Sequence, residues 1–286
     1  MGCKGMEICP RLPNFLVIGA QRSGTTWLHR VLRQHPELWL PPVKELHYFD
    51  RLRARRRGPR GQEWLLLTWF GLTLNTWAFR YYFGKRDERW YARLFEEARA
   101  KGLTAGEITP AYAVLGDDVF CRVRQLNPDI KIMFIMRDPV DRAWSAVNLE
   151  FRAGHIEKPL TEEKALDYAL SRGAVLRSSY MDTIRRLERI FPAAQLHFCF
   201  FDDLCERPTS LISQMLEFLG VDPGRVSDLI LPPAVNSAAA GKSIPSAFER
   251  DMARKYLPIV EELCDRFEGP PHRWRGRYQR LLNSAS

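Results

Sequence analysis

Short runs of apolar residues alternate along the chain with longer segments whose apolar residues recur at helical spacing. Continuous apolar runs are typical of buried parallel strands, and such runs lie at 15–18 and 131–136. Further strands are expected at 103–107 and 195–201. Apolar positions three and four residues apart indicate amphipathic helices, which the sequence predicts over 26–33, 117–126, 140–152, 180–191 and 208–219. Strands and helices therefore follow one another in turn.

This alternation predicts an α/β fold, in which helices flank a central parallel sheet on both faces. The chain has 286 residues and shows no internal repeat or low-complexity linker, so we expect one domain over 1–286. Its core should span 14–274, with an insertion at 51–90 and a loose tail at 275–286.

The segment GAQRSGTT, residues 19–26, connects the first predicted strand to the first predicted helix. A strand, a glycine-containing loop and a helix in this order form the context of a phosphate-binding loop, because backbone N–H groups and the helix N-terminus attract an anion. The alternative is a tight turn without a ligand. The loop lacks the lysine of nucleotide-hydrolysing proteins, since Thr25 occupies that position and the cation of the loop is Arg22.

The missing lysine argues against a nucleotide-dependent kinase, in which that lysine reaches the terminal phosphates and a strand-end aspartate holds Mg²⁺. Asp138 follows a predicted strand and could imitate this aspartate, but the preceding Arg137 would compete with a metal ion. His, Cys, Asp and Glu residues do not recur at the spacing of metal ligands. We therefore expect no metal site.

Composition is that of an ordinary globular protein, with 45% hydrophobic and 27% charged residues. Lys and Arg outnumber Asp and Glu by 43 to 34. The resulting net charge of +9 suits an anionic ligand, an acidic polymer or a membrane surface equally well. The arginine-rich segment RLRARRRGPR at 51–60 is either a solvated loop or a polyanion-binding site.

Signals for targeting are few in this sequence. The most apolar stretch, 64–79, is shorter than the ~20 residues that a membrane-spanning helix needs. No apolar leader precedes the first strand, and six cysteines without a CxxC pair indicate reduced thiols. We therefore expect a cytoplasmic protein, with peripheral contact to a membrane left open.

Four motifs together resemble a known family. They are FLVIGAQRSGTTWL at 15–28, KELHYFD at 44–50, EITPAY at 107–112 and MRDPVDRAWS at 136–145. In this combination they are similar to the sulfotransferases that use 3′-phosphoadenosine 5′-phosphosulfate (PAPS), above all to the heparan sulfate sulfotransferase branch and its bacterial relatives. The resemblance runs from about residue 14 to 274, apart from much of 51–86.

The resemblance implies a donor site built from two of these motifs. In the family the first loop wraps the 5′-phosphosulfate, and the corresponding residues here are Gln21, Arg22, Ser23, Gly24, Thr25 and Thr26. The arginine and serine of RDPxxRxxS bind the 3′-phosphate, which assigns Arg137 and Ser145 to that group. A later glycine loop closes over the nucleotide and implicates Gly241 and Lys242, unless 236–245 is a plain surface loop. Arg142 either takes part as well or is a charge on the helix surface.

The resemblance also assigns the catalytic groups. Glu45 matches the glutamate base of the family, with a plain salt bridge to Lys44 as the alternative. His47 matches a histidine near the acceptor, and Arg22 is grouped with them as the cation of the loop. Ile108 stands where heparan-type enzymes carry a lysine. That difference weakens the case for a highly anionic acceptor and leaves Glu107 as a second candidate acid.

We therefore expect in-line transfer of a sulfuryl group from PAPS to a hydroxyl or amine, with a glutamate base and no metal. The alternatives are a nucleotide-dependent kinase and a non-catalytic polyanion-binding protein. The insertion pairs arginines with the aromatic run 64–79, so it either covers an amphiphilic acceptor or forms a core helix pair. The acceptor itself is expected to be amphiphilic or a carbohydrate. We expect no nucleic-acid partner, and the oligomeric state is left open.

Overall fold

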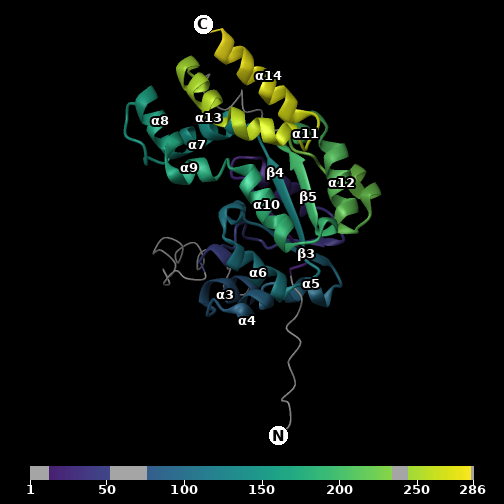
Figure 1. The fold of residues 1–286 in the computed structure, drawn as a ribbon. Helices are drawn as coiled ribbons and strands as arrows, with labels where there is room; N and C mark the ends of the chain where they lie inside the picture. Colours follow the sequence, from purple (N-terminus) through teal and green to yellow (C-terminus); the bar gives the residue numbers. More distant parts are fainter. Residues whose placement is uncertain (1–12, 52–75, 234–243, 285–286) are drawn as a thin grey trace.

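A five-stranded parallel sheet lies at the centre of the computed structural model, which describes residues 13–51, 76–233 and 244–284 (Figure 1). The strands follow the order β2-β3-β1-β4-β5, so the chain begins in the middle of the sheet and later adds strands on both sides. Their bounds are Phe15–Gly19 (β1), Leu38–Trp39 (β2), Thr104–Ile108 (β3), Lys131–Met136 (β4) and Leu196–Phe200 (β5).

Alternate side chains of the central strand β1 enter separate hydrophobic clusters on the two faces of the sheet. Phe15 and Val17 join one cluster with the helices α1 (Thr25–Leu32), α11 (Phe201–Glu206) and α12 (Pro208–Leu219). Leu16 and Ile18 join the other with α6 (Asp117–Leu126), α10 (Tyr180–Ile190) and α13 (Ser246–Cys264). Burial on both faces explains why this strand is apolar at every position.

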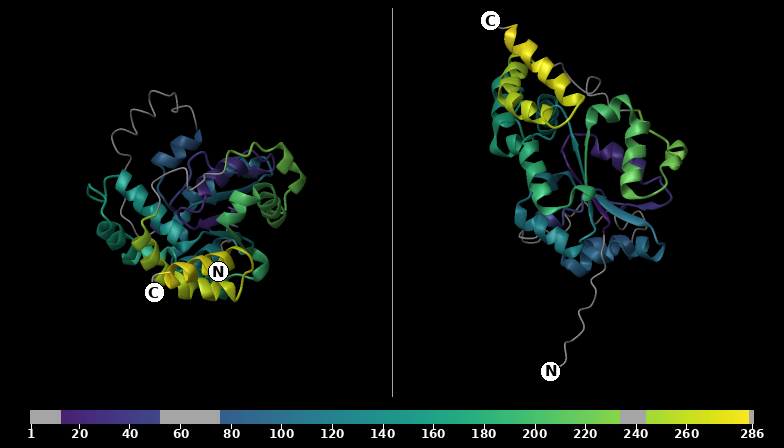
Figure 2. Two further views of the ribbon diagram at one scale, coloured as in Figure 1. Left: turned by 90° about the horizontal axis from the view of Figure 1, so that it is seen from above. Right: turned by 45° about the vertical axis from the view of Figure 1, so that its right-hand side comes forward.

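Further helices gather beyond the carboxyl ends of the strands, towards the top of Figure 1. They are α7 (Pro139–Arg152), α8 (Glu162–Leu170), α9 (Arg172–Leu176) and α14 (Pro270–Asn283), which packs along α13 (Figure 2). Towards the opposite end lie α3 (Thr76–Phe83), α4 (Glu88–Arg93) and α5 (Glu96–Ala100). Short 3₁₀ helices span Phe49–Arg51, Pro110–Val114, Ala193–Gln195 and Pro223–Asp228.

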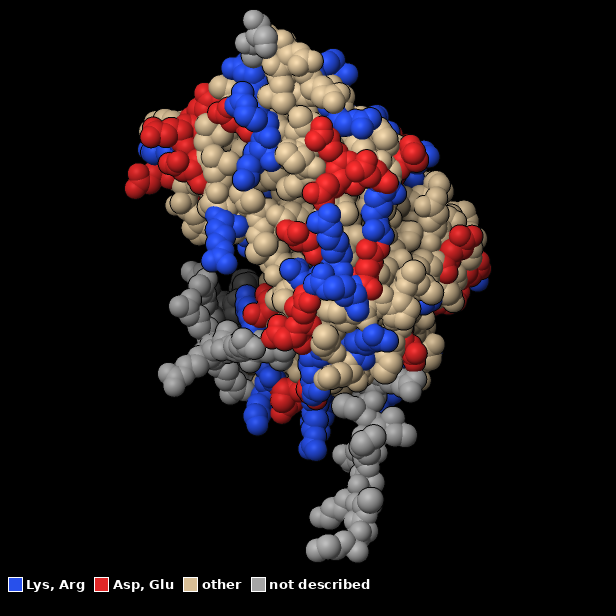
Figure 3. All heavy atoms as spheres, in the orientation of Figure 1, with Lys and Arg blue, Asp and Glu red and all other residues tan. Residues whose placement is uncertain are grey.

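Positive and negative side chains are interspersed over α10 and its surroundings on the face shown in Figure 3. Arginines of α10 form ion pairs with neighbouring helices, Arg186 with Asp117 of α6 (3.0 Å) and Arg185 with Glu262 of α13 (2.6 Å). Exposed pairs of this kind stabilise a fold by about 0–1 kcal/mol each. On this face the basic residues therefore form ion pairs between helices, and they do not form one continuous basic patch.

The predicted α/β fold of one domain with a central parallel sheet is confirmed. The strand–loop–helix at the start of the sheet is β1, the loop and α1. The edge strand β2 was not predicted, because it contains only Leu38 and Trp39, too few to give a hydrophobic pattern.

The prediction of a loose tail at 275–286 is wrong for its described part. Residues up to Asn283 belong to the helix α14, on which Trp274 and Tyr278 are buried in the core one turn apart. Arg277 lies between them and binds three carboxylates of α7, of its N-cap and of α13. The helix is ordered by these long-range contacts, which its arginine-rich sequence does not reveal.

The predicted insertion at 51–90 lies partly outside the described residues, which omit 52–75. Its described part contains α3 and the beginning of α4. Trp77 and Trp90 of these helices are buried in the same cluster as Leu16 of the sheet. This part therefore packs on the core, and the role of the insertion at the acceptor stays a prediction.

Candidate donor and transfer site

The glycine loop between β1 and α1 presents an uncapped helix N-terminus. Gly24 is the N-cap residue, in a left-handed conformation (φ 77°), and supplies no side-chain cap to α1. A Cβ atom here would lie 3.0 Å from the ring of Phe201 and 3.1 Å from Leu204, so both the backbone and the space favour glycine. The first N–H groups of α1 therefore have no side-chain cap, an arrangement that is favourable for an anion.

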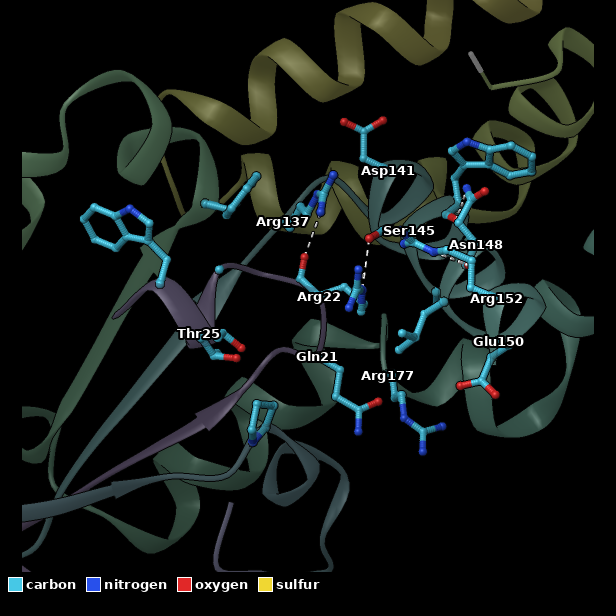
Figure 4. Close-up of a pocket in the computed structure, with 18 of the residues that line it drawn as sticks. Gln21, Arg22, Thr25, Arg137, Asp141, Ser145, Asn148, Glu150, Arg152 and Arg177 are labelled. Atoms are coloured by element: carbon cyan, nitrogen blue, oxygen red, sulfur yellow. Dashed lines mark hydrogen bonds between the residues drawn. The ribbon is translucent and has the colours of Figure 1, made fainter. Parts of the chain in front are cut away.

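A cavity of about 820 Å³ lies beside this loop (Figure 4). The predicted site residues that line it are Gln21, Arg22, Gly24, Thr25, Thr26, Glu45, Arg137 and Ser145. Ser23 is fully buried, and its Oγ has no hydrogen-bond partner in the described part of the chain. His47 contacts Glu45 without lining the cavity, and Gly241 and Lys242 fall outside the described residues.

Arg137, the residue that follows β4, connects the glycine loop to the sheet through a hydrogen bond. Its Nη1 donates a hydrogen bond to the carbonyl oxygen of Arg22 (2.8 Å), and its guanidinium lies 4.6 Å from the centre of the Phe201 ring. The side chain is buried, which lowers the pKa of Arg137, and its Nε has no partner among the described residues. This buried donor of the cation is therefore unsatisfied within the described part of the chain.

Arg22 reaches across the cavity towards α7. Its Nε donates a hydrogen bond to Ser145 Oγ (3.0 Å), so a residue predicted for the 5′-phosphosulfate touches one predicted for the 3′-phosphate (Figure 4). Burial lowers the pKa of Arg22, and the nearby cations Arg137, Arg152 and Arg142 lower it further. The cavity therefore holds concentrated positive charge.

Glu45 lies at the cavity within a chain of charged groups. It contacts Lys44 through Oε1, and its Oε2 lies 3.4 Å from Nε2 of His47. The other ring nitrogen of His47, Nδ1, lies 2.7 Å from Oδ2 of Asp50. A second carboxylate therefore contacts the imidazole. The bond to His47 and then that to Lys44 lower the pKa of Glu45 to about 2 against the effect of burial. Hydrogen bonds to Asp50 and Glu45 raise the pKa of His47 to about 9.

Three non-glycine residues at this site have a left-handed backbone. They are Arg22 (φ 72°), Glu45 (φ 65°) and His47 (φ 53°), and the described ranges contain no other non-glycine residue of positive φ. Such conformations are unfavourable by about 1–3 kcal/mol each and persist only where the surroundings enforce them. Their gathering around one cavity is typical of a functional site.

Glu107 does not line this cavity, although the sequence left it as a candidate acid near the acceptor. It is buried and accepts hydrogen bonds from Thr109 (2.8 Å), Tyr112 (3.2 Å) and Tyr91. Burial raises the pKa of Glu107 to about 7. The carboxylate therefore belongs to the interior that supports the site.

Asp138, the aspartate that could have held a metal, is fully engaged by the protein. Its Oδ1 caps α7 through the N–H groups of Val140 and Asp141 and accepts a bond from the Tyr278 hydroxyl (2.6 Å). Its Oδ2 pairs with Arg277 (3.0 Å), which also binds Asp141 (2.9 Å). These contacts with α14 were not predicted, because the partners lie far apart in the sequence.

Arg142 is not the helix-surface charge that the sequence left open. The side chain is fully buried, and it donates hydrogen bonds to Ser178 Oγ (2.5 Å) and to the carbonyl oxygen of Ala174 (2.9 Å). It does not line the cavity. Arg142 therefore joins α7 to α9 and the residues that follow it.

Several known proteins are similar to this chain. Mouse heparan sulfate glucosamine 3-O-sulfotransferase 5 is 22% identical over 225 residues, which is 76% of this chain and 56% of that protein. Membrane-associated sulfotransferase kil1 of Dictyostelium discoideum is 29% identical over 144 residues, 50% of this chain and 23% of that protein. The chain thus spans about half or less of the length of these relatives.

Solved structures share the fold. A sulfotransferase from Alicyclobacillus acidocaldarius is 26% identical, with a TM-score of 0.64 over 92% of this chain and 98% of that one. Mouse sulfotransferase SULT7A1 complexed with PAP is 14% identical, with a TM-score of 0.51 over 92% of this chain and 88% of that one. The latter likeness shows the fold alone.

The expectation of a cytoplasmic protein is contradicted by these relatives. One is by name a membrane-associated sulfotransferase, and others are by name heparan sulfate enzymes. The expectation rested in part on the spacing of the cysteines, which carries no information about attachment to a membrane. Within the ranges that the structure describes, no helix combines the length and hydrophobicity that a membrane span requires.

The model of the sulfotransferase family matches residues 13–224. This region contains the glycine loop, the segment with Glu45, and both Arg137 and Ser145. The resemblance seen in the four sequence motifs is thereby confirmed, and the chain belongs to the sulfotransferase family.

Proposed function

We propose that this protein transfers a sulfuryl group from PAPS to a hydroxyl or amine of an acceptor, with Glu45 as the general base. The observation that carries the proposal is that one cavity is lined by the glycine loop, by Arg137 and Ser145, and by Glu45. The structure of a protein of the same fold, mouse SULT7A1, has been solved in complex with PAP. PAP is adenosine 3′,5′-bisphosphate, the product that PAPS leaves after transfer.

The cavity fits the charge of the donor. We assign the loop residues to the 5′-phosphosulfate, where the uncapped N–H groups of α1 and the guanidinium of Arg22 would hold its oxygens. Arg137 and Ser145 are assigned to the 3′-phosphate, and the unpartnered Nε of Arg137 is a donor that this phosphate would satisfy. The assignment of Gly241 and Lys242 to the nucleotide stays a prediction from the sequence.

The reaction forms a bond between the acceptor oxygen or nitrogen and sulfur while the bond between sulfur and the 5′-phosphate oxygen breaks. The proton of the acceptor passes to Glu45, and the charge on the leaving phosphate is stabilised by Arg22 and the N-terminus of α1. The carboxylate is ionised at neutral pH, since its pKa is about 2, so it is ready to accept a proton.

A carboxylate of such low pKa is a weak base while both of its cations are in place. Lys44 lines the same cavity as the loop, whereas His47 lies outside it. We propose that Lys44 turns from Glu45 to the sulfate of the donor once PAPS is bound. Loss of this contact raises the pKa of Glu45, and the base then becomes stronger only in the complex that reacts.

The rival reading of a metal-dependent kinase finds less support in the site. Its strand-end aspartate would be Asp138, but this carboxylate is bound by Arg277, by Tyr278 and by two backbone N–H groups. Releasing it for Mg²⁺ would leave Arg277 without one of its partners in a half-buried position. The arginine-rich segment behind the polyanion-binding reading, 51–60, falls largely among the undescribed residues 52–75.

The test combines titration calorimetry with a transfer assay. PAP and adenosine 5′-phosphate are titrated in the presence of EDTA, and release of PAP from PAPS is followed with alcohol and amine acceptors. We expect PAP to bind more tightly than adenosine 5′-phosphate, and its release to depend on the acceptor. Binding of ATP with magnesium but not of PAP would contradict the proposal and favour the kinase.

A further inference from the structure

Glu107 is a buried carboxylate toward which four hydrogen-bond donors converge. It accepts hydrogen bonds from Thr109 Oγ1 (2.8 Å), from the Tyr112 hydroxyl (3.2 Å) and from the Tyr91 hydroxyl. A fourth bond comes from the backbone N–H group of Leu46. An ionised carboxylate has about four acceptor sites, so these donors use its full capacity.

The bond from Leu46 acts on the backbone that carries the proposed base. Leu46 separates Glu45 from His47, and both of these neighbours have a left-handed backbone, with φ of 65° and 53°. Non-glycine residues keep such a backbone only where contacts enforce it. Leu46 is fully buried, and a buried N–H group needs an acceptor. The carboxylate of Glu107 therefore fixes the peptide between the two left-handed residues.

Two tyrosines connect the same carboxylate to the residues that follow. The hydroxyl of Tyr112 donates to Glu107 and accepts from the backbone N–H groups of Tyr48 (2.8 Å) and Phe49 (3.3 Å). A hydroxyl has one proton and two lone pairs, and all three are used here. Tyr91, which also donates to Glu107, stacks on the ring of Tyr48 with the ring centres 4.3 Å apart. These contacts all depend on an acceptor at Glu107.

The ionised form of Glu107 is the one that fits these donors. A proton on the carboxyl group occupies one acceptor site and adds a further donor, so one of the four groups loses its partner. Burial raises the pKa of Glu107 to about 7, against the hydrogen bonds from Tyr91, Thr109, Tyr112 and Leu46, which lower it. The carboxylate therefore changes its charge close to neutral pH.

The tyrosines around Glu107 do not titrate in the same range. Burial raises the pKa values of Tyr91, Tyr112 and Tyr81, so these phenols stay neutral near pH 7. The residue of β1 that lies opposite Glu107 in the sheet, Leu16, is apolar. The change of charge near neutral pH therefore belongs to the carboxylate.

The charged groups of the neighbouring segment keep their pairing in this range. Glu45 and His47 have pKa values of about 2 and about 9, so both remain charged between pH 6 and 8. Lys44 pairs with Glu45, and Asp50 pairs with His47. Arg51 adds a positive charge near His47. Loss of order in this segment near pH 7 would therefore arise from Glu107 and not from its own ion pairs.

We propose that Glu107 is a positioning residue for transfer, whose ionised carboxylate keeps the backbone of Glu45 and His47 in the arrangement that the reaction requires. This inference rests on the proposed function, because it takes Glu45 as the base. Glu107 does not line the cavity, so it acts through Leu46 and Tyr112 and does not touch the substrate. Protonation of Glu107 displaces the base and leaves the donor loop unchanged.

Hydrogen exchange of the backbone at 44–50 tests this role in the protein loaded with PAP. Protection is compared at pH 8 and pH 6, after correction for the intrinsic exchange rate at each pH. We expect wild-type protection to fall by about 5–10-fold at pH 6, because the protonated fraction of Glu107 rises from about one tenth to about nine tenths. Glu107→Gln, which resembles the protonated carboxyl group, should show low protection at both pH values.

Turnover gives a second readout, with the acceptor that releases PAP fastest in the transfer assay. Wild-type turnover should fall by about 5–10-fold between pH 8 and pH 6, while affinity for PAP stays within about twofold. Glu107→Gln should have turnover lowered by about tenfold at pH 8, with no further fall at pH 6. A residue with only a structural role would lower stability and leave the pH profile unchanged.

Tyr91→Phe is a test that leaves Glu107 in place. The change keeps the ring stacked on Tyr48 but removes a bond that lowers the pKa of Glu107, so the midpoint of both profiles should rise by about 1–2 pH units. Asp202→Asn is the matched control. Burial also raises the pKa of this carboxylate of α11, which bonds to Trp274 (3.1 Å) and does not line the cavity. It should keep the wild-type midpoint.

Three results overturn the inference while leaving the sulfotransferase proposal intact: equal protection of 44–50 at pH 6 and pH 8 in the wild type, a pH dependence that survives in Glu107→Gln, and an unmoved midpoint in Tyr91→Phe. Thermal unfolding checks each variant, and the midpoint of Tyr91→Phe decides if Glu107→Gln does not fold. Failure of PAP to bind, or of every acceptor to react, contradicts the proposed function instead. Exchange in the free protein then still tests whether Glu107 orders the segment.

Discussion

The hydroxyl group of Tyr112 donates a hydrogen bond to the buried carboxylate of Glu107 (3.2 Å). The same hydroxyl accepts hydrogen bonds from the backbone N–H groups of Tyr48 (2.8 Å) and Phe49 (3.3 Å), directly after the residues Glu45 and His47. A carboxylate at the end of β3 therefore positions, through one tyrosine, the backbone that carries the proposed base.

Replacing Tyr112 by phenylalanine should destabilise the fold and slow transfer together. The change removes the hydroxyl that accepts hydrogen bonds from two buried N–H groups, so we expect the free energy of unfolding to fall by about 1–3 kcal/mol. Turnover should fall, and affinity for PAP should stay the same. Urea denaturation and the transfer assay measure both effects.

Tyr256→Phe is the control for this change. Tyr256 is also fully buried, but its hydroxyl has no hydrogen-bond partner among the described residues, so its removal should be neutral or stabilising. Equal loss of stability in both variants would show that Tyr112 acts only by filling space.

Replacing Glu45 by glutamine tests the general base. Positioned proton transfer contributes about 10²–10⁴-fold, and turnover should fall by that order. Affinity for PAP should stay within about twofold, since other residues hold the phosphates. Glu97→Gln, at an exposed carboxylate of α5, serves as the control. Near-normal turnover of Glu45→Gln would exclude Glu45 as the base and direct attention to His47.

Stability should decrease at alkaline pH because of His47. Its pKa is raised from 6.5 to about 9, so the charged ring stabilises the fold fully below pH 6.5. This contribution is lost as the pH rises through about 9. The free energy of unfolding, measured in denaturant between these pH values, should fall for the wild type and stay flatter for His47→Gln. His155→Gln, at a ring that is 71% exposed, should follow the wild type.

Acid should act on Glu45 in the opposite sense. Its pKa is lowered from 4.5 to about 2, so the ionised carboxylate stabilises the fold above pH 4.5. That contribution is lost as the pH falls towards 2. Glu45→Gln should therefore reduce the slope of stability against pH in this acid range, and an unchanged slope would contradict the ion pairs with Lys44 and His47.

Ser145→Ala should weaken PAP binding more than binding of adenosine 5′-phosphate, which lacks the 3′-phosphate. Loss of a charge-assisted hydrogen bond typically reduces affinity by about 10–100-fold. Arg137→Ala should weaken both ligands, because Arg137 also holds the carbonyl oxygen of Arg22 in the loop. Calorimetry with both nucleotides makes the comparison, and equal losses for Ser145→Ala would refute its assignment.

Activity should persist in excess EDTA. The neutralising groups in the proposed mechanism are guanidinium and backbone N–H groups, and none of the steps requires a divalent ion. The transfer rate is compared with and without the chelator. Complete loss in EDTA, restored by a single kind of divalent ion, would reopen the kinase-like reading.

Local patterns made much of the fold predictable. The loop at Gly19–Thr26 was placed correctly because a buried strand and an amphipathic helix flank it, and both signals are contained in a few residues. Arg137 and Ser145 were placed together by the same reasoning, since one ends a strand and the other lies about two turns into the helix that follows. The convergence of these groups follows from the parallel sheet.

Contacts between distant segments could not be predicted. The bond from Arg137 to the Arg22 carbonyl depends on the packing of β4 beside β1, and sequence spacing does not show which atom a cation will meet. Asp50 was not singled out, because its role appears only when His47 adopts a left-handed backbone. The helix α14 was predicted as a loose tail, because its sequence is rich in arginine and its apolar pattern is weak. Only two aromatic residues, Trp274 and Tyr278, pack it against the core.

The contacts between α14 and Asp138 also determine the order in which parts of the protein can fold during synthesis at the ribosome. The arginine and tyrosine that bind this buried carboxylate are synthesised 139 and 140 residues after it. Until they emerge, Asp138 lacks these two partners, and its carboxylate stays in contact with water. The nascent chain therefore completes the contacts of Asp138, at the end of β4, only after α14 has been synthesised.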